Sequence, residues 1–447
     1  MFLMSTIRRY TDKLSVTKRK VLANVYWAVL GKVVRIVSEL FVGILVARYL
    51  GPAQYGTMSY VISFVSLFSI LATFGLDNIE IRELARNQVT KEVLIGTAFR
   101  LKLVLACITF VIIGGVVLAF ETDRFTQIMI MVYAVSVIVN SIGVIRNYFT
   151  SIVLNEYVVK TEIFRTIVGM SIKLLLLLFR APLAWFIIAV TFDSILVASG
   201  YLYSYASKVG RVSDWAYSGQ VARYLLRHSF PLLLSGAAVL IYQRIDQVMI
   251  RHMIDSASVG YFSIAAKFTE LIQFLPLVMS QTIAPLLIRA RETNRETYHR
   301  KRQQFVDVIV WTALLLAVAV SLSSFWLVRL TYGAQYLKAV PVLQILAFKS
   351  VGMALQASSG QLIIIEHLQK WAVIRNLIGV VICVGMNLLL IPKFGIVGSA
   401  WATIITVVFT GCLANVFIPP YYPVLKIQLR ALLLGWRELL HVRTLWA

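Results

Sequence analysis

The sequence has few charged residues for its length. Of its 447 residues, 14% are Asp, Glu, Lys or Arg and 59% are hydrophobic, whereas soluble domains carry about 25% charged residues. So few charges cannot cover the surface of a soluble protein. This composition therefore excludes a soluble protein and predicts that the chain lies in a membrane.

Cysteine and acidic residues are also scarce. The three cysteines, Cys107, Cys383 and Cys412, all lie in apolar stretches, a pattern that indicates neither a disulfide framework nor a zinc site. The 20 acidic residues are outnumbered by 43 Lys and Arg, which gives a formal net charge of +23. A nucleic-acid-binding protein would gather such an excess in a soluble basic module, and the sequence contains none. We therefore expect no nucleic-acid partner.

Long apolar runs recur along the whole chain. A membrane-spanning helix needs about 20 mostly apolar residues, and we find twelve candidate segments. They lie at 21–47, 57–76, 93–119, 127–147, 158–179, 182–204, 229–250, 259–289, 305–330, 339–365, 371–391 and 394–419. The sequence thus predicts an all-α polytopic membrane protein with two six-helix lobes, 21–205 and 229–419, which a polar cytoplasmic linker at 206–228 connects.

The basic residues between the predicted spans lie mainly on one side. Because Lys and Arg are retained on the cytoplasmic side of a membrane, both termini are predicted to be cytoplasmic, with a basic segment at 1–20 and an amphipathic tail at 420–447. In this tail Lys426, Arg430 and Arg437 share one helical face and leucines cover much of the rest. This pattern is typical of a helix on an anionic membrane surface, and a thirteenth span is the alternative.

Charged residues also fall inside the predicted spans. A charge at the bilayer centre costs about 2.5–3.5 kcal/mol on the insertion scale, so such a residue normally faces a cavity or a partner. A positively charged vestibule between the two halves would attract a phosphorylated or pyrophosphorylated substrate. The basic residues that we predict to bind such a substrate are Lys32, Arg35, Arg244, Lys267 and Lys349.

Acidic residues accompany these basic ones. Glu39 lies four residues after Arg35, on the same helical face, and three similar residues occur in later spans. Because such groups can bind a proton or a cation, they are candidates for coupling transport to an H+ or Na+ gradient. The candidates are Glu39, Asp193, Asp246 and Glu270. The sequence leaves the coupling ion open, and it indicates no bound cofactor and no metal site.

A structural interpretation competes with the functional one. Buried ion pairs can fix helix packing, and long basic side chains near span ends can reach the lipid headgroups. We favour this interpretation for the basic residues near the inner ends of spans, which are Arg100, Lys102, Arg165 and Arg375.

A short internal repeat relates the two predicted halves. Residues 50–59 align with residues 254–263, and Ala, Gly and Ser coincide at the third, sixth and ninth steps after the first residue. Both stretches join the first and second spans of their halves. Because each half holds an even number of spans, the copies would share one orientation, related by an axis along the membrane normal.

Four sets of short motifs follow one another along the chain. They are ARYLGPAQYG at 47–56, 75–78 with 82–85, 244–246 followed by 259–261, and 332–333. They resemble the polysaccharide transporter family, the O-antigen flippases of the multidrug/oligosaccharidyl-lipid/polysaccharide superfamily, and 47–56 resembles the first outer loop of that family. The order and spacing of these stretches extend the resemblance over essentially the whole chain.

The resemblance implies a fold and a function. The fold is two six-helix lobes around a central cavity in a bacterial inner membrane. The function is a flippase, not an enzyme, that moves an undecaprenyl-pyrophosphate-linked oligosaccharide from the inner to the outer leaflet by alternating access. Such an oligosaccharide would be a repeat unit of an O-antigen, as in lipopolysaccharide, or of an exopolysaccharide. The family has no catalytic signature, so the resemblance implies only cationic cavity positions, here Lys32, Arg35, Arg244 and Lys267.

Two other functions stay open. A cation-coupled multidrug exporter of the same superfamily would favour an acidic cavity, whereas the first span carries two basic residues and one acidic residue. A polytopic polysaccharide polymerase or ligase typically presents a long outer loop with catalytic basic residues. The longest predicted outer loop, near Arg329 and Lys338, offers little room for such a site. Besides the lipid-linked oligosaccharide and membrane lipids, a polysaccharide polymerase is a candidate partner.

Overall fold

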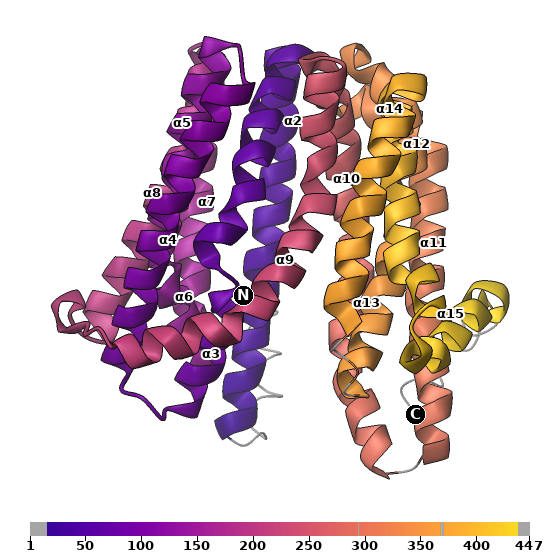
Figure 1. Ribbon diagram of the computed structural model, residues 1–447. Coiled ribbons are helices and arrows are strands. Elements are labelled where there is room, and N and C mark those ends of the chain that lie inside the picture. Colours follow the sequence, from indigo (N-terminus) through magenta and orange to yellow (C-terminus); the bar gives the residue numbers. More distant parts are fainter. Residues whose placement is uncertain (1–15, 294, 367, 369–370, 437–447) are drawn as a thin grey trace, which may run out of the picture. The chain divides into compact units, whose positions relative to one another are not determined.

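The computed structural model describes residues 16–293, 295–366, 368 and 371–436. Every regular element within these residues is a helix (Figure 1). This confirms the all-helical prediction.

The described residues form two compact units. Unit 1 contains the described parts of Met1–Val46 together with Phe68–Leu233, and unit 2 contains Ala47–Leu67 with the described parts of Leu234–Ala447. The first long helix, α2 (Val16–Thr73), therefore contributes residues to both units. The lobe boundaries that the sequence analysis gives, 21–205 and 229–419, stay a prediction.

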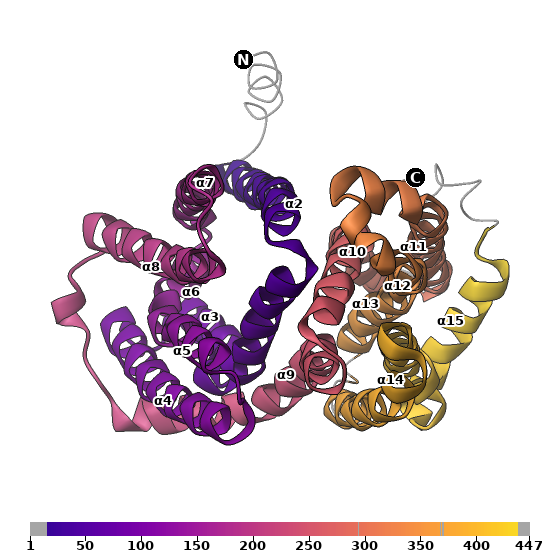
Figure 2. The ribbon, with the colours of Figure 1, turned by 90° about the horizontal axis from the view of Figure 1, so that it is seen from above.

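Unit 1 is built around a series of packed helices. Helix α4 packs on α5, α5 packs on α8, and α8 packs on α7, as the end-on view shows (Figure 2). Besides the two ends of α2, the elements of unit 1 are α3 (Leu76–Arg86), α4 (Lys91–Phe120), α5 (Arg124–Val139), η1 (Asn140–Gly143), α6 (Val144–Ser151), α7 (Asn155–Leu178), α8 (Leu183–Lys208), η2 (Val212–Asp214) and the first part of α9 (Gly219–Met253).

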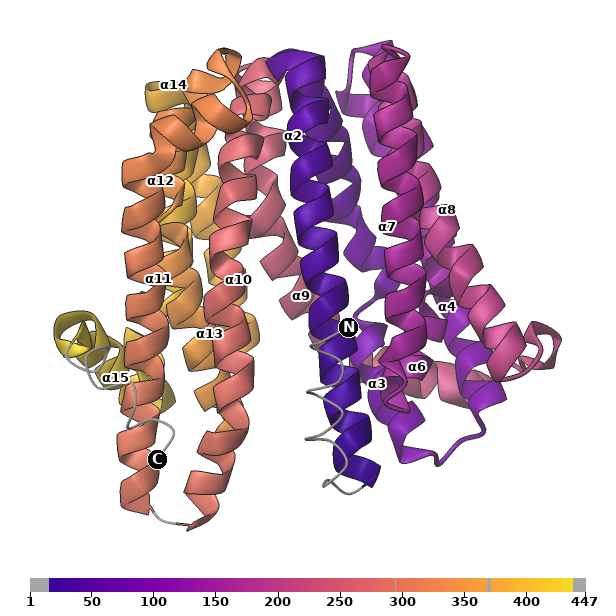
Figure 3. The ribbon, with the colours of Figure 1, turned by 180° about the vertical axis from the view of Figure 1, so that it is seen from behind.

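Unit 2 has its core where α10, α11 and α13 meet. Helices α10 and α11 run side by side (Figure 3), and α11 packs on α13, which in turn packs on α14. Residues at the centre of this core, such as Phe305 and Leu362, are fully buried. The elements are the rest of α9, α10 (Ser256–Thr293), α11 (Arg295–Thr331), η3 (Ala334–Ala339), α12 (Val340–Leu346), α13 (Lys349–Ile365), α14 (Ala372–Gly411), η5 (Leu413–Val416), η6 (Pro419–Tyr421) and α15 (Tyr422–Leu434).

The spans agree with the predicted number of about twelve. Nine helical stretches in the described part of the chain are long and apolar enough to cross a membrane. Two of them contain a glycine with non-helical backbone angles, Gly51 (φ 71°) and Gly395 (φ 59°). Gly51 lies between two predicted spans, and Gly395 lies at the start of the second span of its pair. Helix α7 adds one more 24-residue helix. The chain is thus a multi-pass membrane protein.

The two copies of the internal repeat touch each other within unit 2. A Cβ added at Gly56 would lie 1.7 Å from the carbonyl oxygen of Ser256, and one added at Gly260 would lie 2.2 Å from the carbonyl oxygen of Pro52. The alignment pairs Gly56 with Gly260 and Pro52 with Ser256, so the contact is reciprocal. Such reciprocity is what a two-fold relation between the copies produces, and it supports the repeat.

Candidate functional site

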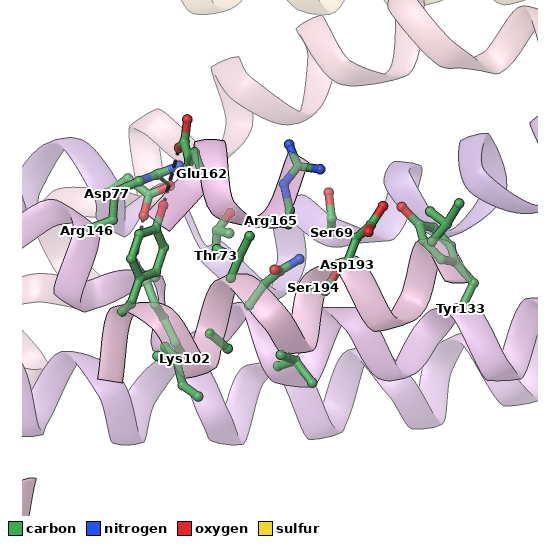
Figure 4. Close-up of a pocket in the computed structure, with 18 of the residues that line it drawn as sticks. Ser69, Thr73, Asp77, Lys102, Tyr133, Arg146, Glu162, Arg165, Asp193 and Ser194 are labelled. Carbon is green, nitrogen blue, oxygen red and sulfur yellow. Dashed lines mark hydrogen bonds and ion pairs between the residues drawn. The ribbon is translucent and has the colours of Figure 1, made fainter. Parts of the chain in front are cut away.

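A polar cavity lies inside unit 1. Residues of α2 to α8, with η1 among them, enclose a volume of about 450 Å³ (Figure 4). Hydroxyl and amide groups line it together with basic and acidic side chains. The charged lining residues are Arg35, Lys102, Arg146 and Arg165, and Asp77, Glu162 and Asp193.

One side of the cavity is a closed network of ion pairs. The Lys102 ammonium group lies 2.7 Å from Asp77 Oδ1 and 2.8 Å from Glu80 Oε2. The side-chain amide of Asn147 donates to the same two carboxylates, at 2.8 and 2.6 Å. The side chain of Lys102 is 3% exposed and that of Glu80 is 0% exposed. A buried charge needs such partners, so this network agrees with the structural interpretation of Lys102.

A second ion pair involves a predicted coupling residue. Asp193 of α8 is buried and accepts a hydrogen bond from Lys173 of α7, with 2.6 Å between Nζ and Oδ2. Its other oxygen, Oδ1, has no hydrogen-bond partner among the described residues. Gly169 makes room for this carboxylate, because a Cβ there would lie 2.1 Å from Oδ1. Lys173 therefore neutralises the charge of Asp193, and Asp193 Oδ1 accepts no hydrogen bond from a described residue.

Two guanidinium groups of the cavity are held much more loosely. Arg165 lies 3.7 Å from Glu39, whose side chain is 49% exposed, and its buried Nε has no hydrogen-bond partner in the described part of the chain. In Figure 4 the Arg165 guanidinium is drawn with no interaction to the other labelled side chains. Arg35 also lines the cavity, and no ion pair joins it to a described residue. The cavity thus contains positive charge that close carboxylates do not neutralise.

Unit 2 gathers the remaining predicted residues in a second charged cluster. Arg244 of α9 lies 3.4 Å from Glu270 of α10. Lys349 of α13 interacts electrostatically with Asp246, Glu270 and Arg244. Lys267 and Glu270 both interact electrostatically with the buried Tyr55. These side chains come from three predicted spans, and ion pairing and electrostatic interactions connect them into one cluster.

Asp246 is the most deeply buried member of this cluster. It is 2% exposed, and α14 supplies two donors to its carboxylate. The Asn387 amide donates at 2.8 Å to Oδ1, and the Thr403 hydroxyl donates at 2.8 Å to Oδ2. Asn387 in turn accepts a hydrogen bond from Ser399 at 2.8 Å. Because both oxygens are satisfied, this carboxylate is bound firmly to α14.

The predicted site residues lie in two separate places, the cavity of unit 1 and the charged cluster of unit 2. Arg35 and Asp193 line the cavity of unit 1, and Glu39 contacts it through Arg165. The side chain of Lys32 lies outside the described residues. Arg244, Asp246, Lys267, Glu270 and Lys349 belong to the cluster of unit 2.

Sequence reasoning missed the contribution of α7 to the cavity. Glu162, Arg165, Gly169 and Lys173 follow a helical spacing and lie on one face of α7,. All four contact either the cavity or Asp193. This polar stripe within a predicted span, 158–179, was the signal that could have identified Arg165. No group of three or more His, Cys, Asp or Glu suited to a metal ion occurs among the described residues.

Comparisons with known proteins agree with this architecture. Residues 21–289, more than half of the chain, match the model of a family described as polysaccharide biosynthesis protein. An uncharacterized membrane protein of Methanocaldococcus jannaschii is 21% identical over 424 residues, which cover 87% of this chain and 82% of that protein.

Two solved structures are similar in fold. The lipid II flippase MurJ in an inward closed conformation has a TM-score of 0.70 at 14% identity, over 93% of this chain and 92% of that chain. An inward-facing multidrug resistance transporter of the MATE family, within the MOP superfamily, has a TM-score of 0.68 at 15% identity, over 88% and 95% of the two chains. The expected fold class is thereby confirmed.

Proposed function

Because the chain belongs to the polysaccharide biosynthesis protein family, and is a membrane transporter rather than an enzyme, we propose that it is a flippase for a lipid-linked oligosaccharide. The proposed substrate is a repeat unit of an O-antigen or exopolysaccharide attached to undecaprenyl pyrophosphate. Its headgroup moves from the inner to the outer leaflet by alternating access. In this proposal the protein lies in a bacterial inner membrane, with both termini in the cytoplasm.

The observation that carries this proposal is the unequal pairing of charges in the cavity of unit 1. Two of its three lining acids have close cationic partners, since Asp77 lies 2.7 Å from Lys102 and Asp193 lies 2.6 Å from Lys173. The third, Glu162, accepts a hydrogen bond from the Tyr201 hydroxyl at 3.3 Å. Arg165, in contrast, has its nearest carboxylate at 3.7 Å. Guanidinium groups bind phosphate oxygens in a bidentate manner, and the low dielectric of a membrane protein interior strengthens that attraction. Arg35 and Arg165 are therefore the residues that we expect to hold the pyrophosphate.

The rest of the cavity lining suits a sugar. Ser69, Thr73, Asn140 and Ser194 place hydroxyl and amide groups in the same cavity, and such groups can donate to and accept from sugar hydroxyls. In the proposed mechanism the lipid tail stays in the bilayer while the headgroup enters the protein. The cluster of unit 2, with Arg244, Lys267 and Lys349, supplies further positive charge.

For ion coupling, the geometry favours Asp193 over Asp246. Asp193 lines the cavity and has one oxygen without a partner among the described residues. Asp246 has both oxygens bound to donors of α14. An oxygen without a donor can accept a proton or ligate Na+ without first losing a hydrogen bond. We therefore assign H+ or Na+ coupling to Asp193 and its partner Lys173.

The ion pairs in the cavity of unit 1 also make a multidrug exporter of cationic drugs the less favoured function. A cationic drug would need a carboxylate without a close cationic partner. Of the three lining acids only Glu162 lacks such a partner among the described residues, whereas two lining guanidinium groups, Arg35 and Arg165, lack a close carboxylate there. The similarity to the MATE transporter is one of fold and does not distinguish the two substrates. The charge balance of the cavity therefore favours an anionic substrate.

The test is flipping by variants that lack the guanidinium groups. Arg35→Gln, Arg165→Gln and the double variant are expressed in a flippase-null strain, and surface polysaccharide is measured. Purified proteins are also assayed for flipping of a lipid-linked oligosaccharide in liposomes. We expect each single variant to lose most activity and the double variant to lose all of it, while Arg35→Lys and Arg165→Lys retain part. Membrane protein levels are verified by immunoblotting.

Arg100→Gln is the matched control. Arg100 lies in α4 of the same unit, is exposed, and contacts the ring of Tyr217 without lining the cavity. We expect this variant to flip normally. Wild-type flipping by the Arg35→Gln, Arg165→Gln double variant would refute the assignment of the pyrophosphate site.

A further inference from the structure

A second cavity lies in unit 2, between the beginning of α11 and helix α15. Its volume is about 410 Å³. Helix α11 contributes His299 and Arg302, and α15 contributes Lys426 and Arg430. On the predicted topology this end of unit 2 faces the cytoplasm, because the basic residues there mark the inner side.

The charge of this cavity is of one sign. Three of its lining side chains are cationic, and none of its lining residues is a carboxylate. Arg302 is held by Glu366, at 2.7 Å. Lys426 and Arg430 are exposed, and neither forms an ion pair within the described part of the chain. This arrangement differs from the cavity of unit 1, where acids and bases alternate, and it fits an anion.

The position of α15 adds to the attraction. The cavity includes Tyr422 and Pro423, which form the first turn of this 13-residue helix. The Tyr422 N–H donates to the carbonyl oxygen of Pro419 and Pro423 has no N–H, so this end attracts negative charge through the helix dipole. Lys426 and Arg430 lie one turn apart, on the same face. The helix end and the two cations therefore point to one anionic ligand.

Hydrogen bonds hold α15 firmly in place. The buried Gln428 donates to the carbonyl oxygens of Leu355, at 3.1 Å, and Gly411, at 2.7 Å. Trp311 of α11 donates to the carbonyl oxygen of Ala431 at 2.7 Å. The distance between α15 and α11 is thus fixed by the protein itself. A ligand would find the cavity already formed, which lowers the entropic cost of binding.

The surroundings of the cavity identify the source of the anion. On α15 and just after it, Leu429, Leu433 and Trp436 expose 47%, 74% and 46% of their surface. The helix follows the last predicted span, so these apolar groups lie where acyl chains begin. We propose that the cavity binds the headgroup phosphate of an anionic phospholipid, while the apolar face of α15 contacts its acyl chains. This site is separate from the substrate cavity of unit 1.

Native mass spectrometry of the purified full-length protein tests this site. Phosphatidylglycerol is titrated in detergent, with phosphatidylethanolamine of the same acyl chains as the zwitterionic comparison. A basic residue near a membrane surface contributes about fivefold in affinity for anionic lipid, so the Lys426→Gln, Arg430→Gln double variant should bind phosphatidylglycerol about 25-fold more weakly. Its weak binding of phosphatidylethanolamine should not change. The charge-conserving Lys426→Arg, Arg430→Lys variant should bind phosphatidylglycerol as the wild type does.

The matched control is Arg223→Gln, Arg227→Gln, which removes two exposed arginines with the same four-residue spacing at the start of α9. We expect it to bind phosphatidylglycerol normally. An equal loss in this control would overturn the site in favour of a general effect of surface charge. Displacement of phosphatidylglycerol by millimolar inorganic phosphate would overturn the lipid assignment. Retained binding in the Arg35→Gln, Arg165→Gln variant would separate this site from the transported substrate.

Discussion

Lys102→Met is expected to destabilise unit 1 by an amount that the geometry allows us to work out. The substitution keeps most of the side-chain volume but leaves Asp77 and Glu80 without their ammonium partner. Removing one member of a buried ion pair costs about 3–5 kcal/mol. The Glu80 side chain is 0% exposed and bears this penalty in full, whereas that of Asp77 is 38% exposed and can be hydrated in part. Asn147 still donates to both carboxylates, so we expect about 3 kcal/mol.

The assay is thermal unfolding of the purified protein in detergent. A loss of about 3 kcal/mol should lower the midpoint by roughly 6–12 °C for a unit of this size. Adding Glu80→Leu should restore part of the loss, because the second substitution removes the uncompensated buried charge. Lys160→Met is the control, since Lys160 pairs with Glu156 at 2.6 Å but both side chains are about half exposed. It should cost no more than about 0.5 kcal/mol. Equal midpoints for the two lysine variants would refute the reasoning.

Two further predictions concern the close contact of the repeats and the carboxylate of unit 2. Gly56→Val would overlap the Ser256 carbonyl, so disulfide cross-linking between cysteines placed at Thr57 and Ser256, whose hydroxyls lie 3.4 Å apart, should fall to a small fraction. Gly43→Val, with nothing within 4 Å, should leave it unchanged, and equal cross-linking in both would contradict the contact. Asp246→Leu removes one acceptor of the Asn387 amide, whereas Thr403 can still donate to the Ser399 carbonyl oxygen, so it should cost about 1–3 kcal/mol in thermal unfolding. Asp246→Asn should cost markedly less, and if it unfolds as readily as Asp246→Leu the hydrogen-bond account is wrong.

Hydropathy was sufficient to predict the spans because each must be apolar over a fixed length, whatever it packs against. Gly51 falls in the gap between the predicted spans 21–47 and 57–76, and Gly395 lies at the start of the predicted span 394–419. The division of α2 between two units was not predictable in the same way. It depends on which helices residues 47–67 contact, and hydropathy carries no information about contacts.

The candidate site was predictable only in part, for a related reason. The charges inside spans are visible in the sequence, but their partners lie on other helices. The partners of Lys102 are 22 and 25 residues away in the chain, and the amide that completes the network is 67 residues from Glu80. A rule based on depth assigned Lys102 and Arg165 to the same class, because both lie near the inner ends of their spans. The structure distinguishes them by the distance to the partner carboxylate, which is 2.7 Å for Lys102 and 3.7 Å for Arg165.

That separation follows the chemistry of the two side chains. The ammonium groups of Lys102 and Lys173 each lie within hydrogen-bond distance of a carboxylate, whereas the Arg165 guanidinium lies 3.7 Å from its carboxylate. Arginine stays protonated at any physiological pH, so Arg35 and Arg165 keep their positive charge while the pairs around them change. On the proposed function, the arginines provide constant attraction for the pyrophosphate and the Lys173–Asp193 pair responds to the ion gradient. Glu39 lies 3.7 Å from Arg165 and its side chain is half exposed, so their ion pair is weak. A phosphate oxygen can therefore displace Glu39 from Arg165 with little loss of free energy. Glu39→Gln should therefore tighten binding of a pyrophosphate analogue, and weaker binding in that variant would show that Glu39 positions Arg165 instead.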